Sequence, residues 1–292
     1  MMQPVPIVTG LPPGIYFNLD DNIYHNDPAL SRTDLLNLND TPRTYYDNSY
    51  LNPNRKPYKP SSKFMDYGKA FHCMLLEPRE FDKRYQVVPI DVWDDTKIKI
   101  TQEHYYQIIE SIKVLRATKK VGMFLQGATS EVTIVFDHDG LRFRTRHDIF
   151  GPLCTVDPKT AARLDQWVIK REFEQYGYDI QLALYKQSRV RFKEQFLAGE
   201  AHVYGDVNPQ LFDRFMAQEF YEFMFLFQRS TPPHPFRAIF PEDDTEDNGL
   251  RRIEIGKQVY RKNMQEYGGS PWPVCEDKIT PFSMFYGFRE NN

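Results

Sequence analysis

The chain has 292 residues, enough for one large domain or two small ones with a substantial core. Hydrophobic residues make up 41% of it, which excludes a disordered protein, and no apolar run approaches the roughly 18 residues that a bilayer requires. The net charge of −3 is unusual for a nucleic-acid binder, but an acidic metal site can offset basic patches elsewhere. The start has no signal-peptide pattern, so the cytoplasm is the expected location.

Three helices are predicted in the first part of the chain. Residues 28–38 contain the start of the first helix, because Ser31 is placed as an N-cap and apolar residues follow it. Residues 63–78 have apolar side chains at helical spacing up to Pro78, which marks the end. Residues 102–118 form the third. The period then changes from helical to alternating.

A β-hairpin is predicted over residues 130–149, because alternating residues flank Asp139-Gly140. A short strand over 153–157 follows. Helical periodicity returns in 161–177 and 178–187, with a break at Gly177.

The remaining elements complete a mixed sheet. Residues 209–218 read as a helix, 221–228 as a buried strand, 235–240 as its partner strand, and 249–266 as a last long helix. The fold class is therefore α/β (α+β), a mixed β-sheet core flanked by helices. We expect a flexible leader over 1–20, a single domain over 21–275 and a tail over 276–292.

Two acids and a lysine form the candidate catalytic site. Asp157 and Lys159 are two residues apart, so they point to one face if the strand continues through Lys159. Asp148, at the end of the hairpin, could reach the same point from the neighbouring strand. Hydrolysis of a phosphodiester needs a hard cation, which two carboxylates can hold, and a positive group beside the attacking water. Taken alone, the Asp-x-Lys spacing is a weak signal, because an ordinary surface ion pair accounts for most such spacings.

Pro158, between these two residues, cannot donate to a sheet ladder. The strand should therefore end there or be unpaired on that side. The carbonyl oxygen of Pro158 remains available and could still serve as a metal ligand.

Three further side chains accompany this group. Gln181 and Tyr185 lie one helical turn apart on one face, although a buried amphipathic helix explains them too. His72 follows Gly68 on a predicted helix with apolar neighbours, where a histidine satisfied within the core is the ordinary interpretation.

The order of these residues along the chain resembles the RecB-like branch of the PD-(D/E)XK nuclease superfamily. Within that branch the chain is most similar to the exonuclease VIII (RecE) type of phages and prophages. The resemblance covers residues from about 20 to 275 and is carried by the stretches 24-YHNDPALSRTDLLNL-38, 68-GKAFHCMLLEPREFDKRYQVVP-89, 144-RTRHD-148, 156-VDPKT-160, 177-GYDIQLALY-185 and 270-SPWPV-274.

The resemblance implies a restriction-endonuclease-like core and a role for each candidate residue. Asp148, Asp157, His72 and the carbonyl of Pro158 would hold Mg2+, for which Mn2+ is expected to substitute. Lys159 would position or activate the water. Gln181 and Tyr185 would orient the lysine or contact the scissile strand. A second ion near Glu131 is conceivable, and Ser31 and Arg32 could receive a 5′-phosphate at a helix N-terminus by analogy with lambda-type exonucleases.

Two departures from the family stand out. The family usually has an apolar residue where this chain has Pro158, which could change the metal geometry. The segment 188–220 is longer than expected and could be an insertion.

The implied activity is a metal-dependent exonuclease that degrades linear double-stranded DNA from 5′ to 3′ and leaves a 3′ single strand for recombination by annealing. Its partners would be DNA ends, a single-strand annealing protein and further copies of the chain in a ring, within a bacterial host cell that carries the phage or prophage gene. A ring would let basic residues line only the channel. Two alternatives stay open: a single-strand or flap nuclease of the same fold, and a catalytically silent DNA-binding or inhibitory protein.

Overall fold

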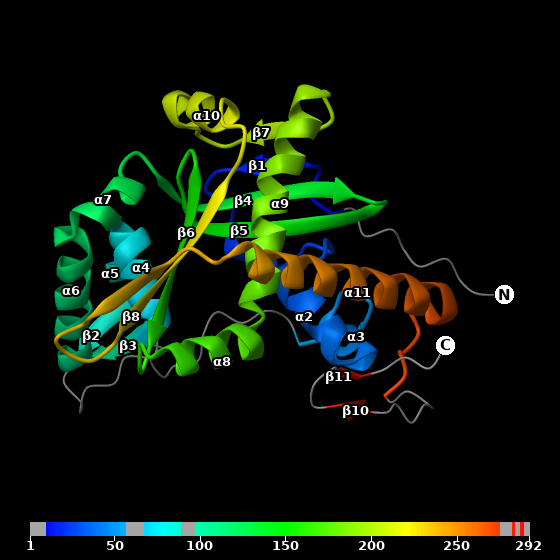
Figure 1. Ribbon diagram of the computed structural model, residues 1–292, viewed down its shortest axis with the longest axis horizontal. Helices are drawn as coiled ribbons and strands as arrows, with labels where there is room; N and C mark the ends of the chain where they lie inside the picture. Colours follow the sequence, from blue (N-terminus) through cyan, green and yellow to red (C-terminus); the bar gives the residue numbers. More distant parts are fainter. Residues whose placement is uncertain (1–9, 57–66, 89–96, 275–281, 284–286, 289–292) are drawn as a thin grey trace.

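The computed structural model is built on a seven-stranded mixed sheet with the strand order β7-β1-β4-β5-β6-β8-β9 (Figure 1). It describes residues 10–56, 67–88, 97–274, 282–283 and 287–288. Two pairs, β1 with β7 and β6 with β8, are parallel, and the others are antiparallel. The strands of this sheet are β1 (Gly14–Tyr16), β4 (Thr129–His138), β5 (Leu141–Phe150), β6 (Cys154–Ala161), β7 (His202–Tyr204), β8 (Glu222–Arg229) and β9 (Phe236–Ile239).

Helices cover both faces of the sheet and enclose two hydrophobic cores. The first core lies between the sheet and a group that we call the α9 side: α2 (Arg32–Asp40), α3 (Pro42–Asn48), α8 (Gln166–Tyr176), α9 (Tyr178–Leu197), α10 (Pro209–Met216) and α11 (Asp243–Tyr267). The second lies under the α4 side: α4 (Tyr67–Leu76), α5 (Pro78–Arg84), α6 (Gln102–Ala117) and α7 (Lys119–Leu125). The helix α1 (Asp21–Asn26) and two small sheets, β2 (Tyr85–Val88) with β3 (Ile98–Thr101) and β10 (Phe282–Ser283) with β11 (Gly287–Phe288), complete the described elements. None of the helices in the described residues is long and apolar enough to span a membrane.

The predicted fold class and most of its principal elements are confirmed. The hairpin turns at Asp139 and Gly140, whose φ angles of 50° and 71° are those of a tight two-residue turn. Ser31 caps α2, and the side chain of Asp34 bonds back to the cap, as in a capping box. The strands predicted over 221–228 and 235–240 pair antiparallel as β8 and β9.

Three boundaries predicted from the sequence are wrong: the end of β6, the start of α8 and the end of α9. The strand β6 continues past Pro158 to Ala161, so α8 begins only at Gln166. The helix α9 does not end near residue 187 but runs on to Leu197, because the polar residues that break its apolar period are themselves buried.

The predicted leader and tail also contain structure. Gly14–Tyr16 within the leader is the strand β1, which pairs with β4 and β7. Most of the predicted tail lies outside the described residues. The described part of the tail consists of the two short strands β10 and β11. The segment 188–220 begins inside α9 and goes on to β7 and α10.

The helices α9 and α11 cross at very close range through Gly249 (Figure 1). A Cβ atom at Gly249 would lie 2.0 Å from the carbonyl oxygen of Asp179. Side chains of α11 also hold the first turn of α9, since Asn248 and Arg252 bond the carboxylate of Asp179 at 2.6 and 2.7 Å. The position of α9 therefore depends on a glycine here.

We expect Gly249→Ala to lower the free energy of unfolding by about 3 kcal/mol, at the upper end of the cost of overpacking, because backbone atoms have to move. Denaturant titration measures it, with Gly122→Ala as the control, since a Cβ there meets nothing within 4 Å. Equal stability of the two variants would contradict the close crossing.

Candidate active site

The candidate site lies where β5 and β6 separate. The two strands pair only at Ile149 with Val156 and Phe150 with Thr155, next to the turn that joins them. Beyond these pairs β6 follows β8, whereas the edge of β5 is bonded by Leu30, which exchanges backbone hydrogen bonds with Arg142 and Arg144. Asp148 and Asp157 are the next residues of each strand, so both acids stand at the opening.

Pro158 and His72 connect the two sides of this opening. The missing N–H of Pro158 costs nothing because β6 has no partner strand on the β5 side at this residue. The Nε2 atom of His72 lies 2.6 Å from the carbonyl oxygen of Pro158, and its Nδ1 atom lies 3.5 Å from an Asp148 carboxylate oxygen. The predicted unpaired side of Pro158 is therefore observed, although the strand does not end there.

Asp157 and Lys159 share the face of β6 that looks toward α9, as their spacing predicts. The Lys159 Nζ atom is 2.6 Å from one oxygen of Asp157, and the Nε2 of Gln181 donates to the other at 2.7 Å. Asp157 is only 1% exposed, so its carboxylate is fixed by these two contacts. The structure thus brings Lys159, Asp157 and Gln181 together.

Two tyrosines of α9 lie beneath this group. The Tyr178 ring centroid is 5.0 Å from the Lys159 Nζ atom, a cation–π distance. The Tyr185 ring packs on His147, with centroids 4.9 Å apart. Burial raises the pKa of both phenols, so they remain neutral at physiological pH. The sequence predicted a role for Tyr185 but missed Tyr178.

Glu131 lies opposite Asp148 at a local break in the hairpin. The ladder contains Ser130 with Ile149 and Val132 with His147, but not the pair between them. Glu131 has a φ of 55°, a left-handed conformation that is costly for a residue with a side chain. The inward–outward alternation of β5 inverts here, since His147 packs toward α9 and Ile149 belongs to the α4-side core.

Two acids at the opening, Asp148 and Glu131, have a raised pKa. Burial, and then the neighbouring carboxylate of Asp157, hold the pKa of Asp148 well above its usual range, while Lys159 opposes the shift. Burial raises the pKa of Glu131 to about 7, with Arg146 opposing. In the absence of a cation, the surroundings of these two carboxyl groups therefore favour the protonated, uncharged form.

The raised pKa of Glu131 predicts that the stability of the folded protein depends on pH. The folded protein holds a proton on Glu131 up to about pH 7, whereas the unfolded chain releases it near its ordinary value of 4.5. The folded state consequently binds more protons in this interval, and its stability falls as pH rises through it. Without divalent cations, Glu131→Gln should be more stable than the wild type by about 1–3 kcal/mol at pH 8 and show little difference at pH 4.5.

Denaturant titration in a chelator at both pH values measures this difference. Glu174→Gln, at an exposed position of α8, is the matched control. A Glu131→Gln effect of the same size at pH 4.5 and pH 8 would contradict the raised pKa.

The predicted phosphate-binding residues lie at the same opening but are engaged differently. The Ser31 hydroxyl donates to Asp34 at 2.6 Å, so an acid already occupies this helix N-terminus. The Arg32 Nη1 atom donates to the carbonyl of Tyr176 at 2.5 Å. Its positive charge opposes the burial that raises the pKa of Tyr178 and Tyr185. Of the two residues, Arg32 is the one whose charge is directed at the site.

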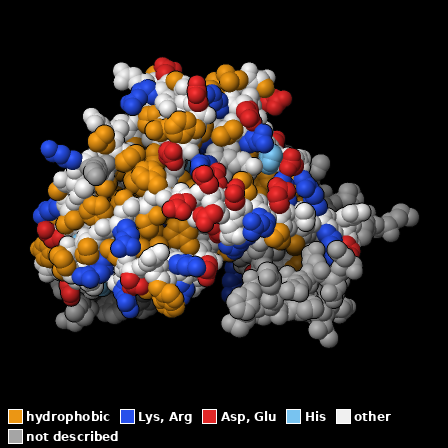
Figure 2. Space-filling model, in the orientation of Figure 1, with side chains coloured by type: hydrophobic (Ala, Val, Ile, Leu, Met, Phe, Trp, Pro, Cys, Tyr) orange, Lys and Arg blue, Asp and Glu red, His pale blue; other side chains and the backbone are white. Residues whose placement is uncertain are grey.

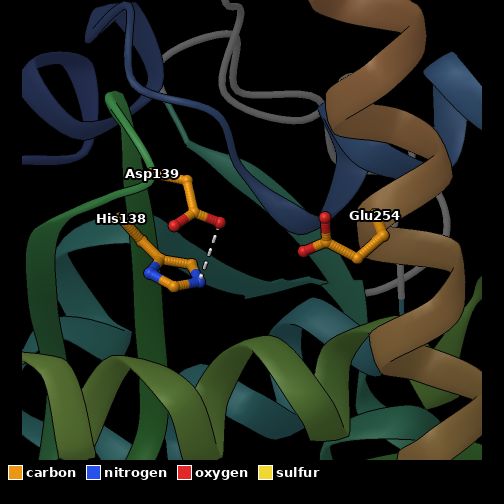
Figure 3. A group of neighbouring side chains, drawn as sticks. All are labelled: His138, Asp139 and Glu254. Carbon is orange, nitrogen blue, oxygen red and sulfur yellow. Dashed lines mark ion pairs between the residues drawn. The ribbon is translucent and has the colours of Figure 1, made fainter.

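A second group of acids and a histidine lies away from this opening. His138, Asp139 and Glu254 come within 4.8 Å of one another at the hairpin tip and α11 (Figure 3). The Lys257 ammonium, which is fully buried, lies 2.5 Å from both carboxylates. This lysine already supplies the positive charge, so the group is a structural ion-pair cluster.

The fold and the family are established by comparison with known proteins. Residues 44–197, more than half of the chain, match the family described as "PDDEXK-like domain of unknown function (DUF3799)", and the chain belongs to this family. A comparison with curated proteins finds no match. Among solved structures, the chain is similar to a protein from Eubacterium rectale named "Putative exonuclease", with a TM-score of 0.58 and 15% identity over 92% of this chain and 97% of that one. The family match and the mixed sheet flanked by helices support the restriction-endonuclease-like fold predicted from the sequence, and the structural likeness shows a shared fold.

The residues present suit a hard divalent cation. Asp148, Asp157 and the Pro158 carbonyl offer the oxygen ligands that Mg2+ prefers, and His72 adds a ring nitrogen. Burial and the neighbouring Asp157 carboxylate raise the pKa of Asp148, so a bound cation would stabilise the charged form of Asp148. The Oε1 atom of the buried Gln181 has no hydrogen-bond partner among the described residues. The donor set therefore fits the metal that a PDDEXK-like fold implies.

Proposed function

We propose that the protein is a metal-dependent exodeoxyribonuclease. It would hydrolyse linear double-stranded DNA from 5′ to 3′ and leave a 3′ single strand for recombination by annealing. One observation carries the proposal: the parting of β5 and β6 gathers Asp148, Asp157 and Lys159 at a single point, with His72 and the Pro158 carbonyl beside them.

Magnesium, with manganese as a substitute, would be held by Asp148, Asp157, the Pro158 carbonyl and His72. When bound, such an ion neutralises phosphate charge and lowers the pKa of a water. Lys159 holds a positive charge 2.6 Å from Asp157, where it can position the attacking water and stabilise charge that develops on the phosphate. Gln181 fixes the Asp157 carboxylate, and the ring of Tyr185, one turn further along α9, packs on His147. Gln181 and Tyr185 would orient the lysine or contact the scissile strand.

The DNA end would be received from the side of Arg32. Because Asp34 occupies the N-terminus of α2, a 5′-phosphate would bind the guanidinium of Arg32 rather than the amides of that helix, and Ser31 would serve mainly as a cap. Negative charge gathers instead in the first turn of α11, which contains Asp243, Asp244 and Glu246. Figure 2 shows a group of acidic side chains near the middle of the face in view. Duplex DNA would avoid that acidic surface.

The proposed setting follows the family resemblance. The chain would assemble as a homo-oligomeric ring on DNA ends, pass its product to a single-strand annealing protein, and work in the cytoplasm of a bacterium that carries the phage or prophage gene. In such a ring the acidic start of α11 would face outward and basic residues would line the channel.

Digestion of a linear duplex labelled at either the 5′ or the 3′ end tests the activity and its direction. We expect early release of the 5′ label in magnesium, no release in chelator, and no attack on a closed circular duplex. Early release of the 3′ label would overturn the polarity, and untouched DNA in both magnesium and manganese would overturn the enzyme.

A further inference from the structure

Tyr176 presents an exposed aromatic ring beside the candidate catalytic lysine. It is the last residue of α8, and its side chain is 44% exposed. Its ring centroid is 5.7 Å from that of Tyr178, which in turn is 5.0 Å from the Lys159 Nζ atom. An aromatic path therefore leads from the lysine to the surface.

The turn between the two tyrosines is fixed by Gly177. Its φ of 61° and ψ of 46° are left-handed, so it ends α8 and starts α9 without an intervening loop. A Cβ at this glycine would lie 3.0 Å from a methyl carbon of Leu36, which keeps the turn packed against α2. The two rings are thus held close together before any ligand binds.

Arg32 adds a positive charge at the same place. Its guanidinium donates to the carbonyl of Tyr176 and makes no ion pair with any carboxylate of the described residues. Other arginines form ion pairs with carboxylates, as Arg146 does with Asp21. A guanidinium that no carboxylate of the described part of the chain neutralises, beside an exposed ring, suits a nucleotide, which offers a phosphate and a flat base together.

We propose that Tyr176 is a stacking platform for one unpaired base of the strand that is cut, with Arg32 holding the adjacent phosphate. The inference rests on the proposed nuclease function and specifies its substrate: a strand end that enters as single-stranded nucleic acid. A paired base has both faces covered by its neighbours in the duplex, so only a base released from the stack can lie on this ring.

The same helix offers a matched control. Trp167 is more exposed than Tyr176, at 67%, but the Arg171 guanidinium lies over its ring at 5.2 Å. Nine residues separate Trp167 from Tyr176, which places them on opposite sides of α8. Loss of the Trp167 ring should therefore leave binding at the catalytic opening intact.

The experiment measures DNA binding without cleavage, in a Lys159→Ala background with magnesium. The probe is a short single-stranded oligonucleotide with 2-aminopurine, a fluorescent base quenched by stacking, at its 5′ end. Tyr176→Ala should weaken binding roughly 5- to 100-fold, the range typical of one lost stacking contact, and relieve the quenching. Tyr176→Phe and Trp167→Ala should behave as the Lys159→Ala parent does.

Different results would remove different parts of the account. Equal affinity and equal quenching in Tyr176→Ala and its parent would overturn the stacking platform, while DNA cleavage by the wild type would leave the nuclease function intact. Failure of the parent to bind any DNA, together with no cleavage by the wild type, would overturn both.

Discussion

Lys159→Ala should lower the rate of DNA cleavage by about 10²- to 10³-fold or more, the usual cost of removing one preorganised charge from a transition state. The physical reason is the position of its ammonium group, 2.6 Å from Asp157 and directed at the opening between β5 and β6. Binding of DNA should change much less, because one cation among several contributes to it. Single-turnover cleavage and a separate binding titration distinguish the two effects.

Lys186→Ala is the matched control for this prediction. Lys186 is also a lysine of the α9 side, but it pairs with Glu246 away from the opening. Its loss should leave cleavage close to the wild-type rate. Equal losses of activity in the two variants would mean that Lys159 contributes only general positive charge.

Arg189→Ala should cause the largest loss of stability among single substitutions near the site. Arg189 is fully buried in α9 and donates to Thr155 Oγ1 at 2.9 Å and to the carbonyls of Gly151 and Pro152 at 2.6 and 2.7 Å. These acceptors belong to β6 and to the turn that joins it to β5. Truncation leaves them unpaired and opens a cavity, so we expect a loss of about 3–5 kcal/mol.

Thermal and denaturant unfolding measure this loss, and Arg191→Ala provides the comparison. Arg191 lies two residues further along α9 and makes a partly exposed ion pair with Glu194, which is worth no more than about 1 kcal/mol. If Arg189→Ala unfolds within 1 kcal/mol of Arg191→Ala, the buried guanidinium does not hold the β5–β6 turn.

Periodicity and turn chemistry predict much of the fold because they are local. The Asp139-Gly140 turn, the Ser31 cap and the alternation of the hairpin residues each depend on a few neighbouring positions. The end of α9 was missed because Arg189 and Ser188 are polar yet buried, and their partners in β5 and β6 are distant in sequence. Local patterns carry no information about such contacts.

The same contrast holds for the candidate site. Asp157 and Lys159 share a face through strand spacing, but Tyr178 approaches the lysine only because Gly177 turns the chain. Glu131 was named from the resemblance alone, yet the sequence also offers a spacing argument: counting outward in pairs from the hairpin turn brings it opposite Asp148. The left-handed backbone that interrupts the ladder there has no sequence signal.

The place where β5 and β6 stop pairing explains both the local fold and the position of the candidate site. One short stretch of pairing at Ile149 and Phe150 joins the strands. Beyond it, the edge of β5 bonds Leu30 and the facing edge of β6 contacts the His72 side chain, so the two strands no longer pair with each other. Pro158 suits this arrangement because it removes a donor that would otherwise need a partner. The site therefore arises from the place where the sheet stops pairing.

The most direct test of the account is the anomalous difference density of a crystal soaked in Mn2+. We predict a peak bounded by the carboxylates of Asp148 and Asp157, the Pro158 carbonyl and the His72 ring. A peak confined to Asp139 and Glu254, or no peak beside Asp148 and Asp157 at saturating metal, would contradict a metal-dependent nuclease centre at this opening.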